Sequence, residues 1–239
     1  MNNMDFFTEK YRHIWERDIP QFQELGVNSI RLYSVDPSND HSAFMCALKA
    51  AGIYAVVELA SGHHPKSAIL SSEAPDCYPK HLKIRGEEIM REFSMYSNTL
   101  AFSAGNEVNH AVPIGKKPQW NAPCLKKFVR DMRAYSRNCD GMRHVPVGLI
   151  MADSDRDANT LYYNCQMDDD DDDLDHAEWY GLNTYVYCNA NHTSFDQAGG
   201  FKLLLDSFES YNYSIPVLLT EFGCLSKSFA TIDSYQGQR

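Results

Sequence analysis

Six short apolar segments recur along this 239-residue chain, and a longer amphipathic segment separates each one from the next. The short segments are mostly apolar without a regular alternation of polar residues, which is typical of parallel strands that are covered on both faces. The longer segments place apolar residues three and four positions apart, the spacing of one helix face. Strands that alternate with helices predict an α/β fold built on a parallel sheet. An open doubly wound sheet and an eight-stranded barrel both fit this pattern.

The predicted elements follow one another with few gaps. Gly26 and Gly52 end the first two predicted helices, because glycine is favoured just past a helix C-terminus. We predict strands at 29–35, 54–60, 99–104, 145–151, 179–186 and 216–220. We predict helices at 11–25, 41–51, 80–96, 124–138, 158–164 and 201–211.

The charge of the chain argues against a nucleic-acid partner. It carries 22 Lys and Arg against 32 Asp and Glu, a net charge of −10. Nucleic-acid binding relies on clustered cationic side chains, so we expect no nucleic-acid partner. A neutral partner such as a carbohydrate is compatible with this charge. No apolar run approaches the length of about 18 residues that a membrane span needs.

The sequence signatures of nucleotide-binding, zinc-protease and serine-hydrolase sites are absent. No two cysteines show the Cys-x-x-Cys spacing of a zinc or redox site. The acidic run at 168–173 lacks the glycine of a calcium loop, so we interpret it as a solvated loop. His63 and His64 are interpreted as surface or substrate-loop residues rather than metal ligands. We therefore expect no cofactor and no metal.

Two glutamates stand at comparable positions in the predicted sheet. Glu107 follows the strand at 99–104, and Glu221 follows the strand at 216–220. In an α/β barrel the carboxyl ends of the strands carry the active site, so two such side chains can face each other there. A glycosidase uses this arrangement, with one carboxylic acid as proton donor and one carboxylate as nucleophile. The alternative interpretation is that both are ordinary surface acids at strand ends.

Both glutamates belong to a longer series of short motifs, which run in order along nearly the whole chain. The motifs are RDIP at 17–20, NSIRLY at 28–33, VDP at 35–37, AGIY at 51–54, NTLAF at 98–102, AGNEV at 104–108, VRDM at 129–132, VPVG at 145–148, YGLNTY at 180–185 and PVLLTEFGC at 216–224. In this series the chain resembles glycoside hydrolase family 72, the β-1,3-glucanosyltransferases of fungal cell walls.

The resemblance implies a (β/α)8 TIM barrel with retaining chemistry. By similarity, Glu107 is the general acid/base, Glu221 is the nucleophile and Asn106 holds the 2-hydroxyl of the donor sugar. The resemblance also assigns substrate-binding positions at strand ends, with Tyr185 near the nucleophile: Tyr33, Glu58 and Tyr185. The family usually carries Asp at position 58, so the longer side chain of Glu58 is a departure.

The family activity implied is cleavage of β-1,3-glucan and transfer of the new reducing end to a second glucan chain. Glu221 must be ionised to attack, whereas Glu107 must start protonated and later act as a base. Transfer requires a bound sugar acceptor that excludes water. A retaining endo-β-1,3-glucanase that only hydrolyses is the first alternative. A vestigial, non-catalytic glucan-binding barrel is the second.

The match to the family pattern is incomplete at both ends. Only strands two to seven of eight are predicted, so we expect residues 1–239 to form one incomplete barrel domain without a second domain. Such a sheet would expose unpaired edges. The missing first and eighth strands favour the vestigial alternative.

The cysteines depart from the family pattern in part. The family's first bridge falls at positions that here hold Trp15 and Phe44, so that bridge is absent. By similarity Cys188 and Cys224 form a second family bridge, and Cys165 matches a cysteine whose family partner lies further along the chain. We expect free and mostly buried thiols at the remaining positions: Cys46, Cys77, Cys124 and Cys139.

Location and assembly are expectations of the resemblance rather than of the residues. No signal peptide is evident at the N-terminus, and the glycosylation triplets at Asn191 and Asn212 are weak evidence for secretion. Family analogy suggests a secreted glycoprotein at the cell wall or the outer plasma-membrane surface, with membrane anchoring by that analogy alone. We expect a monomer whose partners are β-1,3-glucan donor and acceptor chains.

Overall fold

The computed structural model describes residues 4–60, 69, 77–109, 121–165, 173–186, 194 and 197–223. Within these residues six strands form one parallel sheet in chain order, as predicted. The strands are β1 (Ser29–Leu32), β2 (Tyr54–Glu58), β3 (Thr99–Asn106), β4 (Val147–Ala152), β5 (Tyr180–Thr184) and β6 (Val217–Phe222). The helices are α1 (Arg12–Glu24), α2 (Ser42–Ala50), α3 (Lys80–Phe93), α4 (Ala122–Asn138), α5 (Arg156–Asn164) and α6 (Gly199–Ser210), with short 3-10 helices η1 (Glu9–Tyr11) and η3 (Asp173–Asp175).

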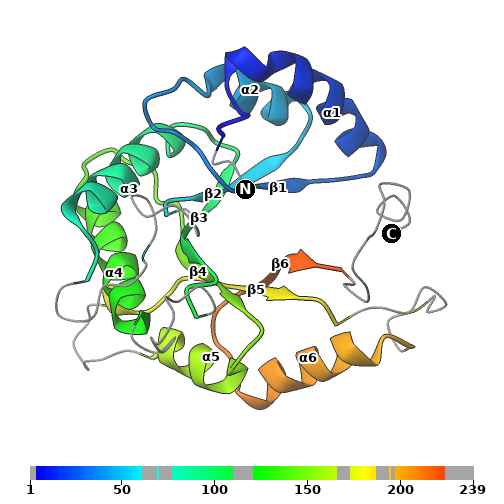
Figure 1. Cartoon of the computed structure of the whole chain (residues 1–239), viewed down its shortest axis with the longest axis vertical. Coiled ribbons are helices and arrows are strands. Elements are labelled where there is room, and N and C mark those ends of the chain that lie inside the picture. The colour runs from blue at the N-terminus through cyan, green and yellow to red at the C-terminus, as the bar shows by residue number, and fades with distance from the viewer. Residues whose placement is uncertain are drawn as a thin grey trace.

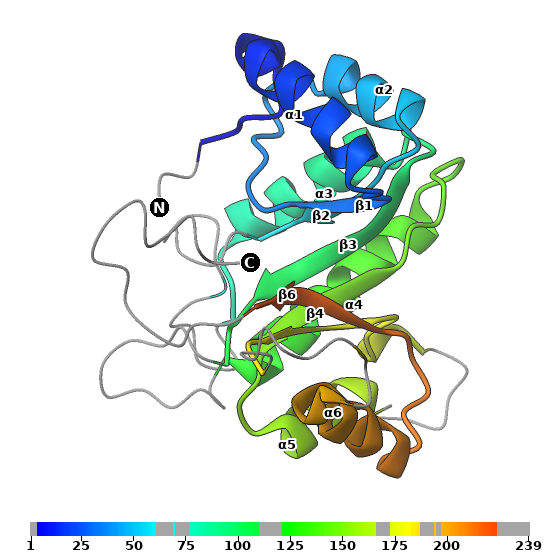
Figure 2. The same ribbon diagram turned by 90° about the vertical axis from the view of Figure 1, so that its right-hand side faces the viewer.

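The sheet curls into an incomplete (β/α)8 barrel. Figure 1 shows the strands on the inside of an arc, with the six helices covering its outer face. The side view in Figure 2 places α1 and α2 at one end of the molecule and α5 and α6 at the other. Among the described residues β1 pairs only with β2, and β6 only with β5. These strands are therefore the two open edges, which correspond to the predicted strands two and seven.

Apolar side chains fill both faces of the curved sheet. The main core lies between the sheet and the helices, where the predicted stripe of α4 is buried at Leu125, Phe128, Val129 and Met132. A small second cluster of Val56, Ala101, Ile150 and Trp179 fills the inside of the curve. Filling the inside with side chains is typical of an α/β barrel, which is a packed core rather than a pore.

The predicted element boundaries need local correction. The first strand ends at Leu32 rather than 35, since an edge strand has one neighbour and its pairing with β2 stops at Val57. The last strand instead continues through Glu221, which therefore lies inside β6 and not beyond it. Gly26 and Gly52 do end α1 and α2, with left-handed φ values of +72° and +76°.

Trp15 and Phe44, the positions at which the resemblance predicted a missing disulfide, form an aromatic contact. The Trp15 and Phe44 rings meet edge to face with centroids 5.8 Å apart, and both side chains are buried between α1 and α2. Trp15 also donates its indole N–H to the backbone oxygen of Thr8 at 3.1 Å. Packing therefore joins the same two helices that a covalent bond would join.

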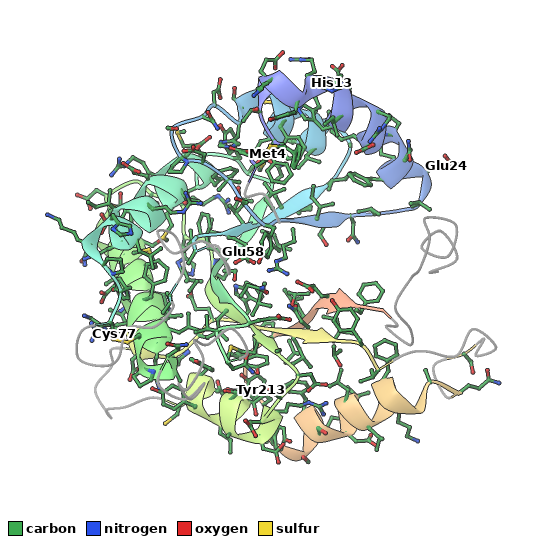
Figure 3. All side chains as sticks on the ribbon, viewed as in Figure 1. Met4, His13, Glu24, Glu58, Cys77 and Tyr213 are labelled. Atoms are coloured by element: carbon green, nitrogen blue, oxygen red, sulfur yellow. A yellow bond between two sulfur atoms is a disulfide. The ribbon has the colours of Figure 1, made fainter. Side chains whose placement is uncertain are left out.

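The prediction of free thiols at Cys77 and Cys124 is wrong, because these two residues form a disulfide with a Cα–Cα distance of 4.8 Å. Spacing along the chain could not reveal the pair, since only the packing of α3 against α4 brings the segments together. Figure 3 labels Cys77 beside α4, on the outer layer of the barrel. Cys46 and Cys139 carry free thiols as predicted, but Cys46 is exposed and Cys139 is only half-buried. Cys188 and Cys224 lie outside the described residues.

A buried histidine fastens the N-terminal segment to the helical layer. The His41 side chain is fully buried, with Nε2 at 2.8 Å from Asp5 Oδ2 and Nδ1 at 2.7 Å from Glu92 Oε1. Burial alone would lower its pKa, but the hydrogen bonds to the two carboxylates raise the pKa of His41 to about 9. The imidazolium therefore ties the segment before η1 to α3.

No helix in the described part of the chain is long and apolar enough to cross a membrane.

Replacing Cys77 and Cys124 together by Ala should lower the free energy of unfolding by about 3 kcal/mol, because the bridge constrains a long loop of the unfolded chain. The two residues are 47 positions apart. Urea unfolding without reductant measures the loss. Cys46→Ala removes an exposed thiol and is the matched control with no expected change. Equal stability of the double variant and the parent would contradict the assignment.

His41→Gln should lower the free energy of unfolding at pH 6 by about 3 kcal/mol, since a buried cation between two carboxylates is lost. The pKa of His41 is raised from 6.5 to about 9, so its contribution is complete below pH 6.5. That contribution disappears as the pH rises through 9. Urea unfolding at pH 6 and pH 10 should show the parent–variant difference shrinking, and a constant difference would count against the ion pair.

Candidate active site

The guanidinium of Arg31 is shared by residues from three other strands at the carboxyl end of the sheet. Nε donates to Glu58 Oε1 at 2.7 Å, Nη1 to Glu221 Oε1 at 2.9 Å and Nη2 to Asn106 Oδ1 at 2.8 Å. The Arg31 side chain is 14% exposed. Burial opposes its charge, but the two carboxylates raise the pKa of Arg31 above its usual value. One cation thus links β1, β2, β3 and β6.

Glu58 is the last residue of β2 and the most enclosed acid of this group. Its side chain is 1% exposed, and Figure 3 labels it on the inner side of the curved strands. Burial raises the pKa of Glu58, and the contacts with Arg31 and the Ser103 hydroxyl offset only part of that rise. Oε2 of Glu58 has no hydrogen-bond partner. Glu58 therefore pairs with Arg31 through Oε1 and serves as its buried counter-ion.

Asn106 and Glu107 occupy the end of β3, where the strand carries an extra residue. Ser103 pairs with Gly148 and Asn106 with Ile150, so three steps along β3 match two along β4. Such a bulge re-aims side chains at a barrel rim. Glu107 then adopts a left-handed φ of +49°, which costs a non-glycine residue about 1–3 kcal/mol. Its backbone N–H donates to the Ile150 oxygen at 2.8 Å, which holds this conformation.

Asn183 of β5 connects the candidate acid to the rest of the site. Its Nδ2 donates to Glu107 Oε1 at 2.8 Å and to Asn106 Oδ1 at 3.1 Å. Its Oδ1 accepts a hydrogen bond from the Thr220 hydroxyl of β6 at 2.8 Å. A continuous set of hydrogen bonds therefore runs from Glu107 through the two asparagines to Arg31 and Glu221.

Glu221 accepts a hydrogen bond on each carboxylate oxygen. Arg31 occupies Oε1, and the Tyr185 hydroxyl donates to Oε2 at 2.7 Å. Burial and this hydrogen bond to the carboxylate raise the pKa of Tyr185 to about 12, so the hydroxyl stays protonated and remains a donor. The Glu221 side chain is 35% exposed, which leaves it accessible from the open end of the sheet.

Tyr33 lies one residue past β1 and borders the same group. The Arg31 guanidinium carbon stands 5.1 Å from the centre of the Tyr33 ring, a cation–π contact. Burial and the nearby Glu58 charge raise the pKa of Tyr33, while a hydrogen bond with Asn106 opposes the shift. Tyr33 therefore keeps its proton and can donate to a polar ligand.

The structure places in one group the side chains for which catalytic or substrate-binding roles were predicted: Tyr33, Glu58, Asn106, Glu107, Tyr185 and Glu221. Their roles stay predictions. Sequence reasoning missed Arg31, Asn183 and Thr220. Arg31 and Asn183 are polar residues inside otherwise apolar strand segments, which is the signal that could have identified them. Thr220 gave no signal beyond its place before Glu221.

The arrangement suits proton transfer combined with nucleophilic attack. Glu58 and Glu221 contact one guanidinium directly, and Glu107 is linked to it through Asn183 and Asn106. In the described ranges no group of three or more His, Cys, Asp or Glu side chains could hold a metal ion. His63 and His64 lie outside those ranges.

A family model described as glucanosyltransferase, for glycoside hydrolase family 72, matches residues 2–237. The chain belongs to this family. It is 36% identical over 218 residues to the 1,3-beta-glucanosyltransferase PGA4 of Candida albicans, covering 90% of this chain and 44% of that protein. It is 37% identical to the 1,3-beta-glucanosyltransferase gas1 of Schizosaccharomyces pombe, covering 87% of this chain and 35% of that protein.

Solved structures of the family agree with this fold. Saccharomyces cerevisiae Gas2p in complex with laminaripentaose superposes with a TM-score of 0.77 at 29% identity, covering 94% of this chain and 46% of that one. The chain thus spans less than half the length of these family 72 relatives. The incomplete barrel therefore corresponds to part of a larger protein in each of them.

Glu58→Gln should gain stability relative to the parent as the pH rises from about 4.5 toward neutrality. The pKa of Glu58 is raised from 4.5 by burial, so the folded state binds this proton more tightly than the unfolded state. The parent therefore loses free energy of unfolding as the pH passes through the raised pKa, and the Gln variant does not. Urea unfolding at pH 4.5 and pH 7 measures this difference. Glu58→Asp keeps a titrating group and should retain the parent's pH dependence, whereas a pH-independent effect of Gln would contradict the prediction.

Proposed function

We propose that this chain is the catalytic barrel of a β-1,3-glucanosyltransferase, which cleaves β-1,3-glucan and transfers the new reducing end to a second glucan chain through a covalent glycosyl-enzyme. The observation that carries this proposal is the network that joins Glu107 and Glu221 through Arg31, Asn106 and Asn183. Membership of family 72, whose relatives are named 1,3-beta-glucanosyltransferases, supports the same activity. The net charge of −10 suits a neutral polysaccharide better than a polyanion.

In the first step Glu221 is the nucleophile. Its carboxylate forms a bond to the anomeric carbon while the bond from that carbon to the glycosidic oxygen breaks. Arg31 and Tyr185 each donate to one oxygen of Glu221, which fixes the plane of the carboxylate. Neither donor is removed when the glycosyl-enzyme forms, so the same contacts support the departing carboxylate later.

Glu107 supplies the proton that the departing glucan oxygen needs. Its left-handed backbone and its hydrogen bond to Asn183 hold the carboxyl group at the strand end. The Asn106 oxygen already accepts from Arg31 and Asn183, so the NH2 group, which also contacts Tyr33, is the part that can donate to a sugar. A donor at this position suits the 2-hydroxyl oxygen, a contact that strengthens in the transition state.

In the second step an acceptor hydroxyl attacks the anomeric carbon, its proton passes to Glu107, and Glu221 is released as a carboxylate. A glucan hydroxyl as acceptor gives a longer chain, whereas water gives hydrolysis. Transfer prevails when a bound glucan holds its hydroxyl close to the intermediate, because that raises the effective concentration of the acceptor over water.

Glu221→Ala and Glu107→Gln should each reduce turnover of laminari-oligosaccharides by about 10³-fold or more, since one removes the nucleophile and the other the exchangeable proton. Chromatography of the products measures both cleavage and the appearance of chains longer than the donor. Glu209→Gln, on the exposed face of α6, is the matched control and should keep full activity.

Each alternative gives a different product pattern. Shorter chains alone from the parent would indicate a retaining endo-β-1,3-glucanase. Oligosaccharide binding without turnover would indicate a vestigial barrel. Full activity of either glutamate variant would remove that residue from the mechanism.

A further inference from the structure

Asn183 holds the Glu107 carboxyl group in the steps above, and Thr220 contacts Asn183 without taking part in them. We propose that Asn183, locked by Thr220, is a positioning residue that confines the acid proton of Glu107 to Oε2. This inference rests on the proposed function, in which Glu107 is the general acid/base. It follows from the direction of each hydrogen bond in the series that leads from Arg31 through the two asparagines to Glu107.

The direction is set at Arg31, because a guanidinium has N–H donors and no acceptor. The Asn106 atom that meets Arg31 Nη2 at 2.8 Å must therefore be the carbonyl oxygen Oδ1. The amide of Asn106 has one orientation only. The buried ion pair with Glu58 and the contact with Glu221 hold Arg31 in place, so this starting point is firm.

The fixed orientation of Asn106 then orients Asn183. The Asn183 atom at 3.1 Å from Asn106 Oδ1 must be a donor, so it is the NH2 nitrogen Nδ2. The second hydrogen of that nitrogen is directed at Glu107 Oε1, at 2.8 Å. Turning the Asn183 amide over would place an oxygen against the Asn106 oxygen and lose both hydrogen bonds.

Glu107 consequently receives a hydrogen bond on Oε1 in both protonation states. An oxygen that accepts from Nδ2 is the carbonyl oxygen of a carboxylic acid, so the acid proton belongs on Oε2. Oε2 then gives the proton to the departing glucan oxygen and takes one from the acceptor hydroxyl. The anchored Oε1 keeps the group in place between the two steps.

Thr220 completes the lock from the strand of the nucleophile. Leu182 pairs with Leu219 and Asn183 with Glu221, so Thr220 is the extra residue of a bulge in β6. Its hydroxyl donates to Asn183 Oδ1 at 2.8 Å, which is the only orientation compatible with an Asn183 oxygen.

Gly181 leaves room for Thr220 at this bulge. A Cβ at position 181 would stand 2.9 Å from the Thr220 methyl group, closer than real Cβ contacts. The bulge at Thr220 therefore positions the neighbouring Glu221 and, through Asn183, orients Glu107.

Several titrating or charged groups face this network, and none of them changes in the variants below. They come from β1, from the end of β2, from the segment after β5 and from β6: Arg31, Tyr33, Glu58, Tyr185 and Glu221. A difference between Thr220→Val and the parent therefore reports the hydrogen bond that Thr220 donates to Asn183.

The test compares Thr220→Val, which keeps the shape and loses the donor, with Thr220→Ser, which keeps the donor. The full chain is assayed by kcat/KM on laminari-oligosaccharides and on a nitrophenyl β-laminari-oligosaccharide, whose leaving group needs no proton. Thr220→Val should lower kcat/KM on the natural substrate by about 5–10-fold, the worth of one hydrogen bond, and leave the activated substrate within about twofold. Thr220→Ser should restore parent behaviour.

A second variant covers the case in which Thr220→Val does not fold, as judged by thermal unfolding. Asn183→Asp places oxygens against Asn106 and Glu107, so natural-substrate kcat/KM should fall by about 100-fold with a smaller loss on the activated substrate. Equal losses on both substrates in either variant would overturn the positioning role, since a distorted nucleophile slows both. A parent without activity on either substrate would instead refute the proposed function.

Discussion

The guanidinium of Arg31 is the interaction on which the site depends, because it contacts residues of β2, β3 and β6 from its own place in β1. Its contact with Glu221 spans 190 positions of the chain and joins the two open edges of the sheet at their carboxyl ends. A group that can only donate also sets the direction of every hydrogen bond behind it. Arg31 thus connects the two open edges of the sheet and, through Asn106, orients Asn183 toward Glu107.

Three acids at the carboxyl end of the sheet have different surroundings. Glu58 is enclosed and serves as an interior counter-ion, whereas Glu221 is partly exposed and receives donors on both oxygens. Glu107 is held by a left-handed backbone and one amide contact. Under the proposed function, Glu107 as the acid and Glu221 as the nucleophile thus have different hydrogen-bond partners.

Stability outside the site depends on contacts within the helical layer. Trp15 and Phe44 pack between α1 and α2, while Cys77 and Cys124 supply a bridge between the entries to α3 and α4. The His41 imidazolium links the segment before η1 to α3. Packing, a covalent bond and an ion pair therefore strengthen different parts of the helical layer around an open-edged sheet.

The sequence by itself determined the six strands and the strand-end glutamates, because hydrophobic periodicity and short motifs are local properties of the chain. Periodicity fitted both an open doubly wound sheet and a barrel, and the resemblance to family 72 implied the barrel. It could not reveal the Cys77–Cys124 pair or the partners of Arg31, since these join segments that only folding brings together. The bulges in β3 and β6 were equally hidden, because register depends on the neighbouring strand. Tertiary structure alone decided which oxygen of each carboxylate is occupied, and so how Glu107 and Glu221 are presented.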